Sequence, residues 1–210
     1  MTFNKLLEKD FFLDDTQLKQ FEKYYFFLNE YNKKINLTSL LQKKDIYLKH
    51  FYDSLLLSKV INFKKIEHLC DLGSGAGFPG LPLKILYPNL KIFLIDSSLK
   101  KINFLKLLVK YLNLSNVFII HDRIEKHFTK YNFVIARALG KLDLILKLAS
   151  FVTNDQSYFI AMKGPSYVEE FQKIKKMHQF ELKKKFFFSL PYEFGKRVNL
   201  LFKKNGKNFI

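Results

Sequence analysis

The stretch Leu69–Gly80, which reads LCDLGSGAGFPG, decides the fold. An apolar run ends in Asp71 and turns through Gly73, Gly75 and Gly77, and glycines there let a ligand approach the backbone N–H groups closely. The pattern predicts a nucleotide-type pocket at the carboxyl end of the first strand of a sheet. The alternative, in which the glycines only shape a tight turn, accounts less well for acidic residues at the ends of two successive strands.

The second acidic residue, Asp96, ends the apolar run Ile92–Ile95 and is placed to accept hydrogen bonds from ribose hydroxyls. A dinucleotide pattern, G-x-G-x-x-G, also matches the loop. A pyrophosphate binder needs free N–H groups where the next helix begins, however, and Pro79, expected in the first turn of that helix, removes one. The charge of Asp71 also favours a cationic cofactor such as S-adenosylmethionine over NAD.

Outside the loop, apolar runs alternate between strand and helix patterns. Runs typical of buried strands are Ile66–Leu72, Ile92–Ile95, Val117–Ile120, Phe133–Ala136 and Tyr158–Met162. Helices are expected from the loop to about Tyr87, over Leu99–Leu112 and over Val168–His178. Two later runs, Lys185–Leu190 and Val198–Phe202, predict an antiparallel strand pair at the sheet edge. The fold class is therefore α/β with a mostly parallel sheet.

The residues before this alternation have helical periodicity. From Asp14 to Asn36 apolar residues recur every three or four positions, and Asp14 or Asp15 can cap the start of the helix. Asn36, which follows the helix, either caps its end, the interpretation we favour, or contacts RNA. A second helix is expected over Lys43–Val60. We therefore divide the chain into a helical N-terminal extension, residues 1–62, and a sheet domain, residues 63–210, packed as one compact unit.

The 210 residues include 36 Lys and Arg against 19 Asp and Glu, a formal net charge of +17, and 48% are hydrophobic, too many for a disordered chain. The charge indicates a polyanionic partner, nucleic acid or an anionic membrane, or else a compositional drift toward lysine. Residues 171–210 hold eleven of the basic residues and two acids, an asymmetry that uniform drift explains poorly. It places the phosphate-facing side at the C-terminal sheet edge, around Lys183–Lys185.

The only cysteine, Cys70, excludes an intramolecular disulfide and lies in an apolar strand, where it is more typical of a core residue than of a nucleophile. No Cys/His cluster has zinc-ligand spacing, and no signal peptide or membrane-spanning run is recognisable. We expect a cytoplasmic protein without a metal or a membrane contact.

Several motifs together carry a resemblance that covers nearly the whole chain in order. They are Tyr31–Ser39, His50–Ser54, Asp71–Pro82, Ile95–Ser97, Arg123–Glu125, Ala136–Ala138, Lys163–Gly164 and Lys196–Arg197. On these residues the chain resembles the glucose-inhibited division protein B family, the small-subunit ribosomal RNA guanine-N7 methyltransferases. Departures are mild: Tyr31 stands where Trp is frequent, Phe78 where Leu is common, and Lys196 where an acid often precedes Arg.

The resemblance implies a class I S-adenosylmethionine-dependent methyltransferase fold, Rossmann-like, with a helical N-terminal extension. It also implies methylation of N7 of a guanine, position 527 in the family, in 16S ribosomal RNA of the small subunit. We expect the protein to act as a monomer. Carried over position by position, the cofactor contacts are Gly73, Gly75, Phe78, Asp96, Ser97, Ile124, Glu125 and Arg137.

Substrate positioning is expected of residues outside the loop, namely His50, Asp53, Arg137, Lys163 and Arg197. His50 and Asp53 either face the cleft or join the helical extension to the sheet, and Lys163 either meets the substrate or faces solvent. The three arginines of this lysine-rich chain all fall in the motifs above, which indicates that a planar, bidentate donor is needed there. We expect Arg137 at the boundary between cofactor and substrate, and Arg197 on RNA.

Guanine N7 offers an exposed lone pair, so no proton must leave before methylation and neither a catalytic cysteine nor a general base is expected. A cytosine-C5 methyltransferase would need a thiolate, which no loop of this chain supplies. One alternative from another class is a non-catalytic, basic RNA-binding protein that keeps the methyltransferase fold. The intact glycines and Asp96 speak against it.

Overall fold

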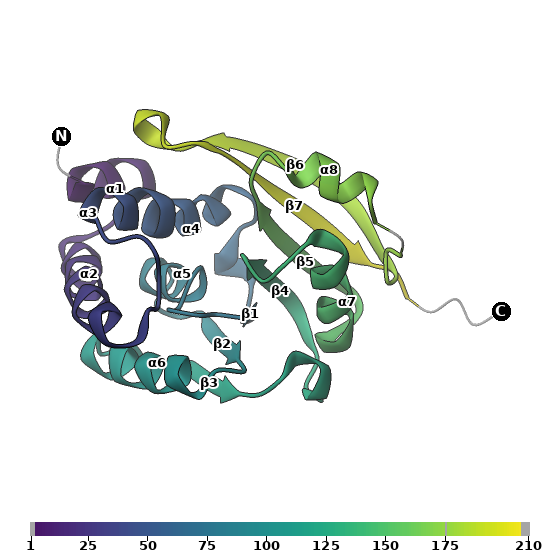
Figure 1. Ribbon diagram of the computed structural model, residues 1–210, viewed down its shortest axis with the longest axis horizontal. Coiled ribbons are helices and arrows are strands. Elements are labelled where there is room, and N and C mark those ends of the chain that lie inside the picture. The colour runs from purple at the N-terminus through teal and green to yellow at the C-terminus, as the bar shows by residue number, and fades with distance from the viewer. Residues whose placement is uncertain (1–2, 175, 207–210) are drawn as a thin grey trace.

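A computed structural model describes residues 3–174 and 176–206 (Figure 1). Its centre is a seven-stranded sheet of order β3-β2-β1-β4-β5-β7-β6. The strands are β1 (His68–Leu72), β2 (Lys91–Asp96), β3 (Val117–His121), β4 (Tyr131–Arg137), β5 (Thr153–Lys163), β6 (Phe180–Ser189) and β7 (Lys196–Lys204). Strands β1 to β5 run parallel, and β7 is antiparallel to both β5 and β6. The predicted α/β sheet with an antiparallel C-terminal pair is confirmed.

Helices cover both faces of this sheet (Figure 1). They are α1 (Phe3–Phe11), α2 (Asp15–Ile35), α3 (Lys43–Asp45), α4 (Asp53–Leu55), α5 (Gly80–Leu86), α6 (Leu99–Tyr111), α7 (Leu142–Val152) and α8 (Tyr167–Gln172). One buried apolar cluster joins the N-terminal helices, α5 and α6 to one face, and a second joins α7 to the other. Within the described part of the chain, no helix has the length and apolarity needed to cross a membrane.

Helix α2 is capped at both ends and fastened to the sheet domain. Asp14 and Gln17 form a capping box at its start, and Asn36 ends it in the left-handed conformation at φ 48°. The Gln17 amide also donates a hydrogen bond to the Ile85 carbonyl at 2.8 Å, at the far end of α5. The N-terminal helices therefore share a core with the sheet, and the division of the chain at residue 62 stays a prediction.

The second predicted helix exists, but it changes character along its length. Between α3 and α4 runs a π-helical segment, η1 (Ile46–Tyr52), and the stretch ends in a 3₁₀ turn, η2 (Leu56–Lys59). A π segment widens the helix and is frequent at functional sites. Apolar periodicity alone gives no sign of it, and it contains or adjoins His50 and Asp53.

Other elements differ from the sequence-based expectation. Helix α7 was not predicted, although its apolar positions are spaced at three and four and pack on the sheet. Helix α8 ends at Gln172, short of the predicted end at His178, and that predicted range includes residue 175, which lies outside the described residues. Strand β6 begins at Phe180, which pairs with Lys204 at the end of β7, and the pairing runs back along β7 to Lys196. Lys183–Lys185 therefore lie within the edge strand.

Candidate functional site

The glycine loop connects β1 to α5 at the carboxyl edge of the sheet. The N–H groups of Gly73 and Ser74 both donate to the Ile95 carbonyl, at 2.8 and 3.1 Å, which anchors the loop to β2. Gly73 has φ +66°, and a Cβ placed on it would lie 2.4 Å from Leu139 Cδ1. Only glycine fits this position without moving a neighbour. Pro79 lies at the N-cap of α5, after a cis peptide bond, and the helix begins at Gly80, so Pro79 precedes the first turn in which it was expected.

The acids at the two strand ends have different roles. Asp71 is fully buried, and its Oδ2 accepts the Gly80 N–H at 2.9 Å, which ties the loop to the following helix. Burial raises the pKa of Asp71 to about 7. Asp96 instead accepts the N–H groups of Gly75 and Ser98, each at 2.9 Å, and faces a cavity. The Asp71 carboxylate is therefore enclosed in the core rather than exposed in a cavity, and its effect on the choice of cofactor stays a prediction.

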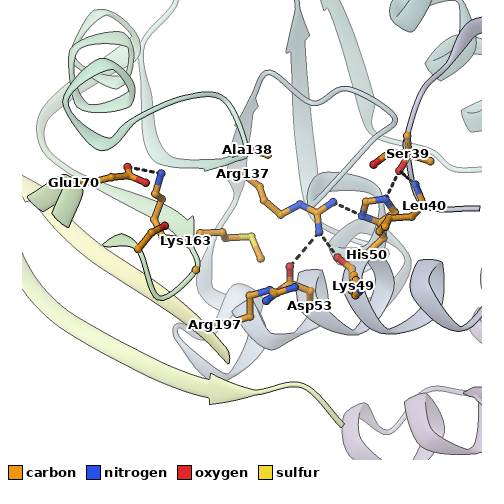
Figure 2. A pocket seen from close by; sticks show the side chains of 14 residues that line it. Ser39, Leu40, Lys49, His50, Asp53, Arg137, Ala138, Lys163, Glu170 and Arg197 are labelled. Atoms are coloured by element: carbon orange, nitrogen blue, oxygen red, sulfur yellow. Dashed lines mark hydrogen bonds and ion pairs between the residues drawn. The ribbon is translucent and has the colours of Figure 1, made fainter. Parts of the chain in front are cut away.

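Three adjoining cavities follow this edge of the sheet. The strand-end cavity, about 380 Å³, lies beyond β2 and β3 and is lined by Asp96, Ser97, Ile124 and others. The loop cavity, about 240 Å³, lies over the glycine loop. The outer cavity, about 420 Å³, lies between η1, the end of β5 and the start of β7 (Figure 2). Ala138, at a positive φ of 54°, lines all three, so the cavities adjoin one another, and we refer to them together as the trench.

The trench brings together every residue that the sequence predicted to bind the cofactor or to position the substrate. The predicted cofactor residues line the first two cavities: Gly73, Asp96, Ser97, Ile124 and Glu125 the strand-end cavity, and Gly73, Gly75, Phe78 and Arg137 the loop cavity. The predicted substrate-positioning residues all line the outer cavity: His50, Asp53, Arg137, Lys163 and Arg197. Arg137 lies where the loop cavity meets the outer cavity. The roles of these residues remain predictions, whereas their common location is observed.

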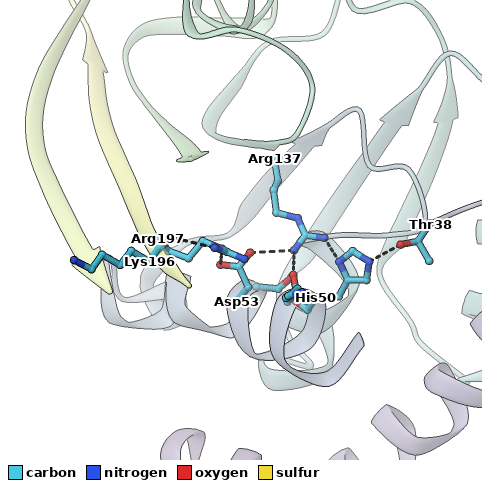
Figure 3. A network of polar contacts seen from close by, with 8 residues as sticks. Thr38, His50, Asp53, Arg137, Lys196 and Arg197 are labelled. Carbon is cyan, nitrogen blue, oxygen red and sulfur yellow. Dashed lines mark hydrogen bonds and ion pairs between the residues drawn. The ribbon is translucent and has the colours of Figure 1, made fainter. Parts of the chain in front are cut away.

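Arg137, the last residue of β4, donates hydrogen bonds to the π segment η1 and to the first residue of α4, which follows it (Figure 3). Its Nη1 donates to the Lys49 carbonyl at 3.0 Å and to Asp53 Oδ2 at 3.3 Å, and its Nη2 donates to His50 Nδ1 at 2.9 Å. A single ammonium group does not span three acceptors in this arrangement. The planar fork of Arg137 thus joins the N-terminal helices to the sheet.

The contacts of His50 fix its protonation state. Because an arginine only donates, His50 Nδ1 accepts and the ring proton sits on Nε2, which donates to Thr38 Oγ1 at 2.8 Å. Burial, and then the charge of Arg137, lower the pKa of His50 to about 3. His50 is therefore a neutral, fixed ring at physiological pH.

Asp53 connects both arginines of the outer cavity. Its Oδ2 contacts Arg137, and its Oδ1 lies 3.3 Å from Arg197 Nε. The Asp53 side chain is 6% exposed, and those of Arg137 and Arg197 are 13% and 22% exposed. Burial raises the pKa of Asp53, while the two guanidinium charges oppose that shift. Both alternatives for His50 and Asp53 hold, since these residues line the cavity and also join the extension to the sheet.

Phe78 forms the apolar support of this cluster. The rings of His50 and Tyr24 both stack on Phe78, with centroids 4.4 and 5.2 Å away. The Tyr24 hydroxyl donates to the Ala76 carbonyl at 2.5 Å, so α2 contacts the glycine loop directly. The sequence analysis missed Tyr24, because periodicity on α2 shows only that it is buried.

Lys163 does not face solvent, so that alternative is wrong. Its side chain is 10% exposed, and its Nζ lies 2.6 Å from Glu170 Oε2 in an ion pair. The same Nζ donates a hydrogen bond to the Gly140 carbonyl at 3.0 Å. Glu170 Oε2 also accepts the Leu142 N–H at 2.7 Å, at the start of α7. The sequence analysis missed Glu170 as well, since one acid in a charged helix carries no distinguishing signal.

Comparison with solved structures gives the fold class. Magnesium protoporphyrin IX methyltransferase from Synechocystis, solved with bound S-adenosylmethionine, superposes with a TM-score of 0.64 over 87% of this chain and 97% of its own, at 12% identity. The ribosomal protein L11 methylase of Lactobacillus delbrueckii gives 0.59 over 75% of this chain and 79% of its own, also at 12% identity. The sheet order and the glycine loop are those of a class I methyltransferase fold.

Sequence comparison then gives the family. Residues 17–199 match the family described as rRNA small subunit methyltransferase G. A relative named ribosomal RNA small subunit methyltransferase G from Aster yellows witches'-broom phytoplasma is 48% identical over 96% of this chain and 99% of its own length. One of the same name from Listeria monocytogenes is 40% identical over 91% and 84%. The chain belongs to this family, which confirms the resemblance found in its motifs.

Proposed function

We propose that the protein transfers a methyl group from S-adenosylmethionine to N7 of a guanine in 16S ribosomal RNA of the small ribosomal subunit. One observation carries the proposal: in the trench, the residues predicted to bind the cofactor line two adjoining cavities, and a polar, arginine-containing cluster lines the third. Membership of the family supplies the class of substrate.

The residues of the first two cavities fit S-adenosylmethionine. The Cβ-free surface at Gly73 lets a ligand lie against the backbone, and Asp96 keeps acceptor capacity for ribose hydroxyls beyond its two N–H partners. Ile124 gives the strand-end cavity an apolar surface for a base. When bound, the cofactor supplies an electrophilic methyl group.

The protein's own residues contribute position rather than proton transfer. His50 is neutral and hydrogen-bonded at both ring nitrogens, so it does not serve as an acid. Cys70 is fully buried with a raised pKa, as expected of a core residue. Guanine N7 needs no base, and a rigid cluster that holds the two reactants together accounts for catalysis of this type.

The charges of the surface suit RNA. Lys183–Lys185 are exposed on the edge strand β6, on the antiparallel pair that carries Arg197 into the outer cavity. The proposal makes the protein a cytoplasmic monomer that acts on the small ribosomal subunit and depends on neither metal nor membrane. Residues 1–62 serve as its helical extension, and residues 63–210 form its methyltransferase domain.

The proposal is tested on small subunits from cells that lack the protein. Purified protein and S-adenosylmethionine are added, and the RNA is analysed by N7-specific cleavage and primer extension. One new cleavage at a single guanine is expected, and unchanged cleavage at every guanine refutes the proposal. Equilibrium dialysis with S-adenosylmethionine separates it from the RNA-binding alternative, because a protein with a dead pocket retains none.

A further inference from the structure

The outer cavity has two polar walls (Figure 2). One is the cluster of Arg137, His50 and Asp53 described above. The other is the Lys163–Glu170 pair, which comes from the end of β5 and from α8. Neither residue of this pair contacts the arginine cluster through a recorded hydrogen bond among the described residues. The pair therefore needs an explanation of its own.

Each member of the pair keeps hydrogen-bonding capacity for a ligand. Lys163 has three N–H donors: one donates to the Gly140 carbonyl, and the ammonium group forms an ion pair with Glu170. Glu170 Oε2 accepts the Leu142 N–H and forms an ion pair with Lys163 Nζ, while Oε1 accepts no hydrogen bond from the residues that the structure describes. A cationic donor and an anionic acceptor thus lie side by side at the rim of a cavity.

We propose that Glu170, with Lys163 beside it, recognises the Watson–Crick edge of the target guanine. The inference rests on the proposed function and names the specificity determinant of that site. Guanine presents an acceptor, O6, next to two donors, N1–H and the 2-amino group. Lys163 donates to O6, and Glu170 accepts from N1–H and the 2-amino group.

Adenine presents the reverse order on the same edge, a 6-amino donor next to the N1 acceptor. It would place the 6-amino group against the Lys163 ammonium and the N1 lone pair against the Glu170 carboxylate. A site built for hydrogen-bond donors rejects a base that lacks them far better than an apolar pocket does. The cavity also offers Leu40 and Met162 as apolar surfaces for the faces of a planar base.

This edge is also compatible with the chemistry at N7. N7 lies on a different edge of the purine, so recognition of N1–H and the 2-amino group leaves N7 free to face the loop cavity. Methylation makes the guanine ring cationic, which strengthens its N–H donors toward a carboxylate. Glu170 therefore interacts more strongly with the transition state than with the bound substrate, which accelerates the reaction.

The test compares guanosine with inosine, which lacks only the 2-amino group. 16S RNA with either nucleoside at the target position is assembled into small subunits, and kcat/KM is measured for the wild type and for Glu170→Gln. Glutamine keeps an oxygen for the Leu142 N–H but loses the carboxylate charge. The neighbouring, exposed Glu169 supplies the matched control, Glu169→Gln.

We expect inosine to cost the wild type and Glu169→Gln about tenfold or more in kcat/KM. For Glu170→Gln we expect a lower rate on guanosine and an inosine penalty below about threefold. An equal inosine penalty in wild type and Glu170→Gln overturns the inference, because a purely structural Glu170 lowers both rates alike. If Glu170→Gln does not fold, equal rates of the wild type on guanosine and inosine are sufficient by themselves to overturn the inference. A wild type inactive on guanosine subunits refutes the proposed function instead.

Discussion

Arg137→Lys tests the idea that a planar fork, rather than a positive charge, is required at the centre of the trench. The guanidinium makes three hydrogen bonds, to the Lys49 carbonyl, His50 Nδ1 and Asp53 Oδ2. Lysine keeps the charge, but its single ammonium replaces about one of these contacts.

The structure sets the size of the effect. Hydrogen bonds to a charged group contribute about 1.5 to 3 kcal/mol each, and little solvent screens these, because Arg137 is 13% and Asp53 6% exposed. Loss of two contacts at the lower figure reduces the free energy of unfolding by about 3 kcal/mol. Release of His50 and Asp53 from their positions costs methyl transfer at least about 1.4 kcal/mol, or tenfold.

Urea denaturation at pH 7 measures the first effect, and single-turnover methylation of small subunits at saturating S-adenosylmethionine measures the second. Arg123→Lys is the matched control for denaturation, since Arg123 is exposed and we expect little change there. Turnover within about threefold of wild type, together with unchanged stability, would show that charge alone suffices at Arg137 and refute the fork argument. Lost stability with intact turnover would make Arg137 a purely structural link.

Three further changes address the loop and the basic edge. For Asp71, burial raises the pKa from 3.8 to about 7, so between these values the folded chain holds a proton that the unfolded chain has released. The stability conferred by the protonated form is therefore lost as pH rises through this window, by about 4 kcal/mol. The difference in free energy of unfolding in urea between wild type and Asp71→Asn should change by that amount from pH 4 to pH 8. Parallel plots of unfolding free energy against pH for the two proteins would contradict this prediction. Gly73→Ala, at φ +66° and against Leu139, should weaken S-adenosylmethionine binding at least about tenfold in equilibrium dialysis while RNA binding persists, and normal dialysis would exclude the close-approach argument. Neutralisation of Lys183–Lys185 with glutamine should weaken RNA association and flatten its salt dependence with cofactor binding unchanged, whereas an unaltered salt slope would place the phosphate contacts elsewhere.

The sequence predicted the trench well because its residues follow strand ends. In a parallel sheet these ends meet at one edge, so Asp96, Ile124, Arg137 and Lys163 had to lie near one another whatever the details of the helices. Position along the chain was enough to infer position in space.

The parts that could not be predicted depend on contacts between distant segments. Tyr24 looks like any buried residue of an amphipathic helix until its hydroxyl is seen on the Ala76 carbonyl. The π segment depends on how residues 46–52 pack. The direction of the Asp71 carboxylate depends on its hydrogen bond from the N–H of Gly80, at the start of α5. The position of the Glu170 side chain depends on its ion pair with Lys163 and on the hydrogen bond that it accepts from the Leu142 N–H.

The position of β7 in the sheet has a consequence for synthesis of the chain. Strand β6 is made before β7, and among the described strands β7 is its one partner. Strand β5 likewise gains its second neighbour when β7 inserts between β5 and β6. A nascent chain in which β1 to β5 have been synthesised already contains the glycine loop and Asp96, but it lacks Arg197 and the last wall of the outer cavity. A product terminated early would retain the cofactor residues without a complete place for the base, so the ability to modify RNA arrives only with the final strand.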